Sequence, residues 1–372
     1  MNKKTILSAM LLLCAAAGLA GLSRWSEAEK DISALDIYDW CRNLSSEEFE
    51  GRLSGHEGYN RAANWAADKF RSWGLLPLLN ENGYLQAFPS PLTEIVEAEL
   101  RAELAAPADG RDKFESVLQA EAMKDFMPLV FSDSGNHEAD LVFCGWGISA
   151  PELGYDDYAG QDVRGKFVVV FRGVPDRSER RFQHHDEHRT RMQLAMKRGA
   201  AGLVYVYPEV NVHPNGDFTP GFTPLMISEE FADRLFKAHD LSSRQLRADL
   251  VRYRRPLSFS MQARFNYRVR TRHDPAAVSY NVAGWIAGSD PQLRNEVLIL
   301  GGHLDAVGRQ MGFFCPGAND NASGSAVLLG LARALSRLTR APEKVHHDRA
   351  LRWRGKGHAG LQPFRGQPAP AF

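Results

Sequence analysis

The sequence has few cysteines, and their spacing argues against the folds that depend on them. Its 372 residues include four: Cys14, Cys41, Cys144 and Cys315. Cys14 lies in an N-terminal apolar run, which leaves an odd and widely spaced set. A disulfide scaffold needs an even set, and a cysteine-based zinc knuckle needs closely spaced pairs. We therefore expect the other three cysteines to be buried free thiols.

The chain also lacks an excess of either charge, because 45 basic residues balance 45 acidic ones. This balance gives no global field that would favour nucleic acid or an anionic membrane. No internal repeat is present, and neither a Gly-x-Ser-x-Gly elbow nor a phosphate-binding loop occurs. Serine-hydrolase and nucleotide-binding functions therefore have no support. The length and the 44% hydrophobic content suit a globular protein of two domains.

The N-terminus has the features of an export signal. Lys3 and Lys4 precede residues 6–22, which are apolar or small apart from Ser8. Ala20, with Gly18 two positions earlier, marks a plausible cleavage site. We predict a signal peptide over residues 1–22 and an exported protein, periplasmic or extracellular. An uncleaved membrane anchor over residues 6–22 is the alternative, although the run is short for a span.

The first part of the chain predicts a helix followed by a region rich in strands. Apolar residues recur at helical spacing over residues 59–73, and Gly74 is a plausible stop. Short β-rich runs bounded by glycine then follow, with one helix among them. We predict a β-rich inserted domain over residues 115–265, between two parts of an α/β domain at 30–114 and 266–343. The expected inserted strands are 140–148, 165–173, 201–207 and 257–269, and the expected helix is 190–199.

After the insert, the pattern becomes that of an α/β fold. Residues 279–288 and 296–305 are predicted strands. The second is almost continuously Val, Leu and Ile, which is typical of a strand covered on both faces. A helix is expected over residues 322–338. Its predicted buried stripe is Val327, Leu331, Leu335 and Leu338.

The residues that carry chemistry lie where this strand ends and this helix begins. His303 and Asp305 end the strand, at the sheet edge where α/β proteins bind ligands. Because side chains two apart on a strand share a face, Asp305 can accept the second ring proton of His303 and fix its tautomer. Asp320 precedes the helix, where negative charge is stabilised, and Asn321 is the expected cap.

These motifs closely resemble those of the co-catalytic di-zinc aminopeptidases, the family that includes glutamate carboxypeptidase II-like enzymes. The resemblance rests on the His-x-Asp at 303–305, on GANDNASG at 317–324, on the lead-in at 281–291 and on the opening segment EGRLSGHEGYNRAANWAADKFRSWGL at 50–75. It implies a zinc-exopeptidase-type mixed sheet flanked by helices. Residues 145–173 and 197–207 resemble the protease-associated domain that many of these enzymes carry, which would make the insert such a domain.

The resemblance also implies roles for individual residues. His303 would bind one zinc ion, Asp320 would bridge two, and Asp305 would orient His303. The peptide bond between Asp320 and Asn321 matches one that is often cis in the family. The implied reaction removes N-terminal residues from peptides, with zinc activating water and a glutamate moving the proton.

The sequence departs from the family after the helix. The family needs a Glu-Glu pair that includes the general base, then a later Asp and a distal His, and none of these is recognisable. Residues 344–372 are rich in Arg, Gly, His and Pro, and they predict a disordered tail. We interpret this tail as a frameshift, because residues 353–364 in a shifted frame can encode GEEKGMQGSSHF. A natural short variant is the alternative.

The departure leaves three hypotheses for function. The first is a zinc-dependent aminopeptidase that, in this chain, retains zinc weakly and has negligible activity, because only two ligands are present. The second is a non-catalytic homologue that binds proteins through the protease-associated domain. The third is a relative of the carboxypeptidases or glutaminyl cyclases, which share a similar metal constellation.

Two other segments contain clusters of polar side chains of the types found in sites. Residues 182–188 offer His184, His185 and His188 beside two carboxylates, but nothing in the sequence fixes their geometry. We expect a solvated polar loop there. Residues 155–158 contain Asp156 and Asp157, which we interpret as a turn and not as a catalytic carboxylate pair.

Overall fold

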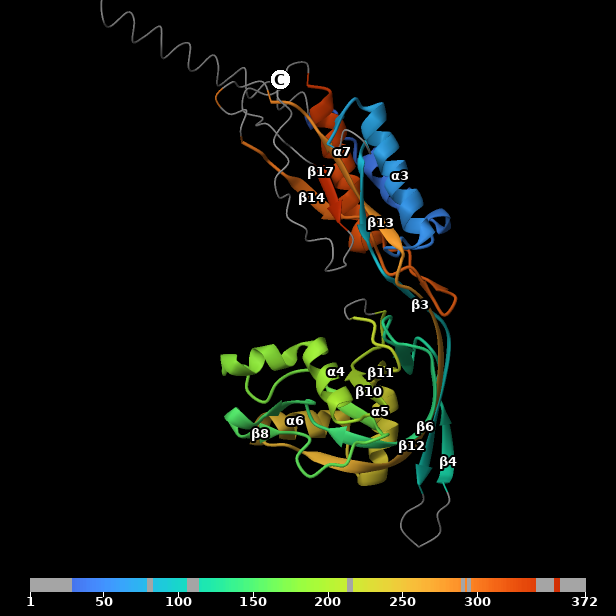
Figure 1. Cartoon of the computed structure of the whole chain (residues 1–372), viewed down its shortest axis with the longest axis vertical. Coiled ribbons are helices and arrows are strands. Elements are labelled where there is room, and N and C mark those ends of the chain that lie inside the picture. Colours follow the sequence, from blue (N-terminus) through green and yellow to red (C-terminus); the bar gives the residue numbers. More distant parts are fainter. Residues whose placement is uncertain are drawn as a thin grey trace, which may run out of the picture. The chain divides into compact units, whose positions relative to one another are not determined.

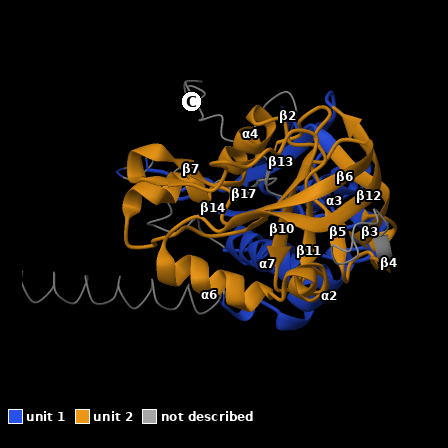
Figure 2. Cartoon of the chain, turned by 90° about the horizontal axis from the view of Figure 1, so that it is seen from below, with its two compact units in different colours: residues 1–92, 275–309, 314–372 blue, residues 93–274, 310–313 orange. Residues whose placement is uncertain are grey.

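The computed structural model describes residues 29–78, 83–105, 114–212, 217–288, 292, 296–338 and 351–354. The predicted signal peptide or anchor lies outside these residues. Among the helices described, none is both long enough and apolar enough to cross a membrane. The chain divides into two compact units, coloured separately in Figure 2. Unit 1 contains residues 1–92, 275–309 and 314–372, and unit 2 contains residues 93–274 and 310–313.

Unit 1 is a mixed sheet packed against helices (Figure 1). Its strands are ordered β1-β13-β17-β14, and β2 also pairs with β13. All pairs are antiparallel except β14 with β17. The strands are β1 (Leu76–Pro77), β2 (Leu85–Pro89), β13 (Val278–Trp285), β14 (Leu300–His303) and β17 (Leu351–Arg354). The helical segments are α2 (Ala34–Leu44), η1 (Glu47–Phe49), α3 (Glu57–Ser72), η5 (Ala318–Ala322) and α7 (Ser323–Ser336).

The helix predicted over residues 59–73 is confirmed as α3. Its small residues Ala62, Ala63 and Ala66 and its Phe70 are buried, so this face packs closely into the core of unit 1. Gly74 adopts a φ of 73°, a left-handed conformation that glycine allows without strain and that ends the helix.

Unit 2 is built on an eight-stranded sheet in the order β4-β3-β12-β6-β9-β10-β11-β5. The adjacent pairs from β6 to β11 are parallel, and β12 and β5 join antiparallel. The strands are β3 (Leu92–Ala105), β4 (Phe114–Gln119), β5 (Phe126–Pro128), β6 (Gly135–Cys144), β9 (Phe167–Phe171), β10 (Gly202–Tyr207), β11 (Leu225–Ser228) and β12 (Ser258–Asp274). The helices are α4 (His188–Lys197), α5 (Glu229–Phe236) and α6 (Ser243–Tyr253).

Short elements complete the described chain. In unit 2 they are β7 (Ser149–Ala150), η2 (Pro151–Leu153), β8 (Tyr155–Asp156), η3 (Arg180–Asp186) and η4 (Lys237–His239). A small two-stranded sheet follows β14, made of β15 (Arg309–Gln310) and β16 (Phe313–Phe314).

The sheet of unit 2 has a separate hydrophobic core on each face. Phe167, Val169 and Phe171 of β9 enter one core with side chains of α5 and α6. Val168 and Val170 enter the other with side chains of α4. This alternation follows from the two-residue period of a strand, and it explains why β9 is apolar throughout. The strands predicted near residues 140, 165, 201 and 257 and the helix near 190 are therefore confirmed.

The predicted boundaries of the inserted domain, 115 and 265, are too narrow. β3 begins before the first boundary and β12 extends beyond the second, yet both strands pair within the sheet of unit 2. The pairing of β3 and of the second half of β12 therefore places residues 93–105 and 266–274 in unit 2.

The strand predicted over residues 296–305 is much shorter in the structure. β14 covers only Leu300–His303, and the side chains of Val297, Leu298 and Ile299 are 47%, 42% and 58% exposed. The prediction assumed that other parts of the chain cover both faces of this apolar segment. In the described part of the chain, β14 pairs with β17 alone, so the apolar run before it is left uncovered.

The tail expected to lack structure contains one strand. Leu351–Arg354 forms β17, which pairs with both β13 and β14. Backbone hydrogen bonds make this pairing possible without an apolar period. The prediction of disorder is therefore wrong for these four residues; the rest of residues 344–372 lies outside the described part.

The buried stripe predicted for the last helix is also wrong in part. Val327 is 46% exposed, and of the predicted stripe only Leu335 is fully buried. α7 is apolar around most of its circumference, so periodicity does not identify one face. The buried face instead contains small residues; a Cβ at Gly330 would lie 3.1 Å from Ile37 of α2, which shows how closely the two helices pack.

The cysteines are free, as expected, but they are not all buried. Cys144 is buried in the sheet of unit 2, whereas Cys41 and Cys315 are half-buried. Burial raises the pKa of the Cys144 thiol, and to a lesser degree that of Cys315.

Candidate functional site

The predicted site residues meet at the end of β14 in unit 1. His303 is the last residue of the strand, and the fully buried Leu304 fixes the chain immediately after it. Asp305 is buried, and Asp320 lies just before α7 with its side chain 64% exposed. The structure therefore brings together the three residues singled out in the sequence, from a strand end and a helix start.

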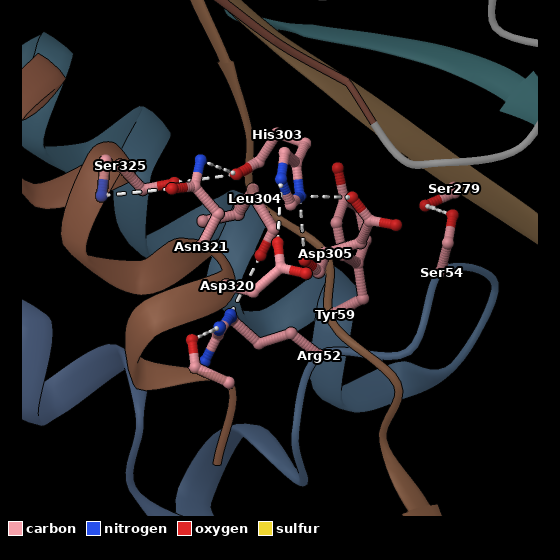
Figure 3. A network of polar contacts seen from close by, with 12 residues as sticks. Arg52, Ser54, Tyr59, Ser279, His303, Leu304, Asp305, Asp320, Asn321 and Ser325 are labelled. Atoms are coloured by element: carbon pink, nitrogen blue, oxygen red, sulfur yellow. Dashed lines mark hydrogen bonds and ion pairs between the residues drawn. The ribbon is translucent and has the colours of Figure 1, made fainter. Parts of the chain in front are cut away.

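The two ring nitrogens of His303 face different carboxylates (Figure 3). Nδ1 lies 3.3 Å from Asp305 Oδ1 and 3.1 Å from the Asp305 carbonyl oxygen. Nε2 lies 3.0 Å from Asp320 Oδ1. A proton on Nδ1 satisfies the acceptors of Asp305 and leaves the Nε2 lone pair on the side of Asp320. This is the tautomer that a metal-bound histidine with an outer carboxylate adopts.

The start of α7 is tied directly to the backbone of His303. Asn321 Nδ2 and Ser325 Oγ donate to the His303 carbonyl oxygen at 3.1 and 3.0 Å. Asn321 Oδ1 also accepts from the Gly324 amide at 3.2 Å, so Asn321 caps the helix as predicted. The peptide bond between Asp320 and Asn321 is cis, as the family resemblance implied.

Two fully buried residues of unit 1 surround this site and were not singled out in the sequence. Arg52 donates to the backbone carbonyls of Leu304, Pro316 and Gly317 at 2.8–2.9 Å. Desolvation lowers its pKa to about 10, and the charge of Asp305 opposes that shift. Tyr59 donates to the Tyr280 carbonyl oxygen at 2.8 Å, and burial raises its pKa strongly.

Nothing in the local sequence pattern reveals these two roles. Arg52 stands among polar and glycine residues in the segment EGRLSGHEG, which predicts an exposed loop. Only the contacts made by distant segments bury its guanidinium. An arginine followed by a glycine-punctuated loop is too common to identify such a residue in advance.

The histidine cluster in unit 2 is not the solvated loop that the sequence predicted. His185 and His188 are each 8% exposed, while His184 is exposed. Two features hold this segment in unit 2. The buried Arg191 donates to Asp186 at 2.9 Å, and His188 is the first residue of α4. His188 Nε2 lies 3.0 Å from Arg172 Nη1, so the Arg172 guanidinium lies directly beside this ring.

Asp156 and Asp157 form a structural turn, as predicted. Asp157 is fully buried and accepts hydrogen bonds from the amides of Trp146 and Ile148 and from the Tyr155 hydroxyl. Desolvation raises its pKa to about 7, although these donors oppose the shift. Across the described residues of both units, no group of three or more His, Cys, Asp or Glu side chains is arranged to hold a metal.

The segment that contains the site is similar to a known protein family. A model of peptidase family M28 matches residues 281–349, the segment that contains His303, Asp305 and Asp320. The match to this family covers that segment of the chain.

Solved structures that are similar to this chain support the fold. An aminopeptidase from Aneurinibacillus sp. strain AM-1 is 21% identical, with a TM-score of 0.54 over 88% of this chain and 63% of that one. A peptidase M28 precursor from Shewanella amazonensis SB2B is 18% identical, with a TM-score of 0.53 over 91% and 67% of the two chains. This chain therefore spans less than two thirds of the aminopeptidase, and the mixed sheet flanked by helices is shared.

The chemistry of His303 and Asp320, which lie in the segment that matches family M28, can be compared with that of the zinc ion that the family implies. Imidazole nitrogen and carboxylate oxygen are both zinc ligands, bound at about 2.0–2.1 Å. Two such atoms on one tetrahedral ion lie about 3.3 Å apart. His303 Nε2 and Asp320 Oδ1 are 3.0 Å apart and partly exposed, so their chemistry and spacing fit a zinc ion.

Proposed function

We propose that this site serves a zinc-dependent exopeptidase of the aminopeptidase type, which removes N-terminal residues from peptides outside the cytoplasm. The observation that carries the proposal is the 3.0 Å approach of His303 Nε2 to Asp320 Oδ1, with Asp305 at the opposite ring nitrogen. When bound, zinc lowers the pKa of water and polarises the peptide carbonyl.

The protein residues would hold and orient the metal ligands. His303 and Asp320 would be ligands, with Asp320 as the bridge if two ions bind. Asp305 would keep the Nδ1 proton of His303 in place, because its carboxylate and its carbonyl both lie within 3.3 Å of that nitrogen. Asn321 and Ser325 would hold the strand end against the helix start through the His303 carbonyl.

Zinc binding by the chain as it stands should be weak. Zinc sites usually have three or four protein ligands, whereas within the described residues only His303 and Asp320 are family-matched ligands. We therefore expect the purified protein to lose zinc on dialysis and to have negligible peptidase activity. Stoichiometric zinc in the dialysed protein, measured by elemental analysis, would contradict this expectation.

The assignment of the ligands can be tested by calorimetric zinc titration of the full chain after treatment with a chelator. We expect His303→Ala to abolish binding, and His184→Ala, an exposed histidine of unit 2, to leave it unchanged. Any hydrolysis of an aminoacyl p-nitroanilide should disappear with chelator and in His303→Ala. Zinc binding that survives His303→Ala would overturn the proposal.

A non-catalytic protein-binding role is the second candidate. It is favoured by the two complete hydrophobic cores of unit 2, which need no contribution from the site in unit 1. Binding of a partner that persists in His303→Ala, in a chain without chelator-sensitive hydrolysis, would support this role. Cleavage of C-terminally free but N-terminally blocked peptides would instead support a carboxypeptidase.

A further inference from the structure

Arg52 is the most completely buried charged side chain near the site. Its side chain is 0% exposed, and its backbone φ is 52°, in the left-handed region. The backbone around it is fixed to the segment after β14: the Ala306 amide donates to the Arg52 carbonyl at 2.9 Å and the Gly308 amide donates to the Gly51 carbonyl at 3.0 Å. The position of the Arg52 guanidinium is therefore set by the main chain as well as by its own contacts.

The guanidinium joins two segments that are distant in sequence. Nε donates to Leu304 O at 2.8 Å, between His303 and Asp305. Nη1 donates to Pro316 O at 2.9 Å and Nη2 to Gly317 O at 2.8 Å, just before Asp320. Nη1 also donates to the Leu44 carbonyl at the end of α2. A single rigid fork thus spans the loop after the strand and the loop before the helix (Figure 3).

The geometry points to a specific role for this residue. We propose that Arg52 is a positioning residue for the metal site: it sets the spacing between His303 and Asp320 by holding the backbone beside each of them. This inference rests on the proposed function for its connection with zinc, but the positioning itself concerns residues of this chain alone. A lysine cannot replace the fork, because one ammonium does not present donors in a plane toward four carbonyls.

Arg52 also supplies a positive charge next to the carboxylates of the site. Its charge interacts with those of Asp305 and Asp320. In a buried setting such a cation offsets the repulsion between carboxylates that face one histidine. Arg52→Gln removes the charge and also replaces the fork with one amide nitrogen on a shorter side chain, so it loses contacts that join the two loops.

The alternative is that Arg52 contributes only to folding. Arg191 of unit 2 provides a matched control, because it is also buried, at 1% exposed, and donates to backbone carbonyls. Its Nε donates to Trp146 O at 2.7 Å, and its Nη2 donates to the Gly173 carbonyl. Arg191→Lys should therefore lower stability through similar lost contacts, without touching the loops that carry His303 and Asp320.

The experiment compares Arg52→Lys, Arg52→Gln and Arg191→Lys in the full chain. Zinc affinity is measured by competition with a chromogenic chelator, and the ring-nitrogen chemical shifts of His303 are recorded by NMR without metal at one fixed pH. We expect Arg52→Lys to weaken zinc binding by about 10-fold to 100-fold, the range for residues that support metal ligands. It should also move the His303 shifts, while Arg191→Lys changes neither despite a lower urea midpoint.

The outcomes separate this inference from the proposed function. If the unmodified chain binds no zinc, the proposed function fails, and the metal-free shifts of His303 still decide the role of Arg52. Unchanged shifts and unchanged affinity in a folded Arg52→Lys overturn the inference. If Arg52→Lys does not fold, Arg52→Gln tests the positioning role of Arg52 instead. A folded Arg52→Gln in which the His303 shifts equal those of the unmodified chain would overturn that role.

Discussion

Two apolar runs, one in each compact unit, are packed in different ways. In unit 2, every side chain of β9 from Phe167 to Phe171 is buried. In unit 1, the side chains of Val297, Leu298 and Ile299 are 42–58% exposed. The runs have similar hydrophobicity, so composition does not account for the difference. What differs is the number of layers: β9 lies between two strands and two cores, whereas residues 297–299 precede a strand with one described neighbour.

The two units also differ in what surrounds their buried carboxylates. Asp157 of unit 2 and Asp305 of unit 1 are both buried carboxylates. Asp157 is surrounded by neutral donors, two amides and a tyrosine hydroxyl. Asp305 has the Arg52 guanidinium close enough to interact with its charge. Asp157 therefore stabilises a turn in unit 2, whereas Asp305 lies beside His303 and interacts with the positive charge of Arg52 in unit 1.

The largest expected effect compares β10, a covered strand beside β9 in unit 2, with the exposed run of unit 1. Leu203→Ala removes a fully buried side chain from β10 and should destabilise unit 2 by about 2–5 kcal/mol, because it leaves a cavity. Leu298→Ala, at a position 42% exposed, should change stability by less than about 0.5 kcal/mol. Urea unfolding followed by circular dichroism measures both. Comparable losses in the two variants would mean that residues 297–299 are covered in solution.

The stability of unit 2 should depend on pH through its buried carboxylate, Asp157. Folding raises the pKa of Asp157 from 3.8 to about 7, so between these values the folded state binds more protons than the unfolded state. Stability from this group is therefore present at low pH and is lost as the pH rises toward about 7. We expect a loss of about 2–3 kcal/mol between about pH 5 and about pH 8, from 1.36 kcal/mol per pKa unit.

The variant Asp157→Asn tests that assignment. Its amide oxygen can accept from Trp146 and Ile148, and it has no charge to titrate, so the pH dependence should flatten. Asp162→Asn, an exposed carboxylate of the same unit, is the control and should leave the dependence as it is. An unchanged pH profile in Asp157→Asn would show that Asp157 stays ionised throughout.

Sequence patterns predicted the secondary structure correctly where the residues that determine it lie within one short segment. α3 has small residues at helical spacing and a glycine stop, and β9 has a glycine-bounded apolar run; both form as expected. His303, Asp305 and Asp320 also meet, because a strand end and the next helix start adjoin at a sheet edge. These features depend on local geometry and on the order of neighbouring elements.

Sequence patterns failed where the outcome depends on distant partners. The burial of Arg52 is decided by carbonyls of residues 304, 316 and 317, which no local pattern connects with it. Val327 looks as apolar as its buried neighbours, but α2 packs closely on the glycine face of α7. β17 forms from Leu351–Arg354, whose composition gives no sign of a strand, because the sheet supplies a backbone partner on either side.

The smallest expected effect compares the first turns of two helices. Ser228 caps α5 of unit 2 by accepting from the Phe231 amide at 3.2 Å, and Asn321 accepts from the Gly324 amide at 3.2 Å in unit 1. Either alanine substitution should cost about 1 kcal/mol for the lost cap. Asn321→Ala should cost roughly 0.5–1.5 kcal/mol more, since Asn321 also donates to the His303 carbonyl. Chemical denaturation measures the difference. Equal costs would mean that the bond to His303 adds no stability, and that Ser325 alone holds the strand end to α7.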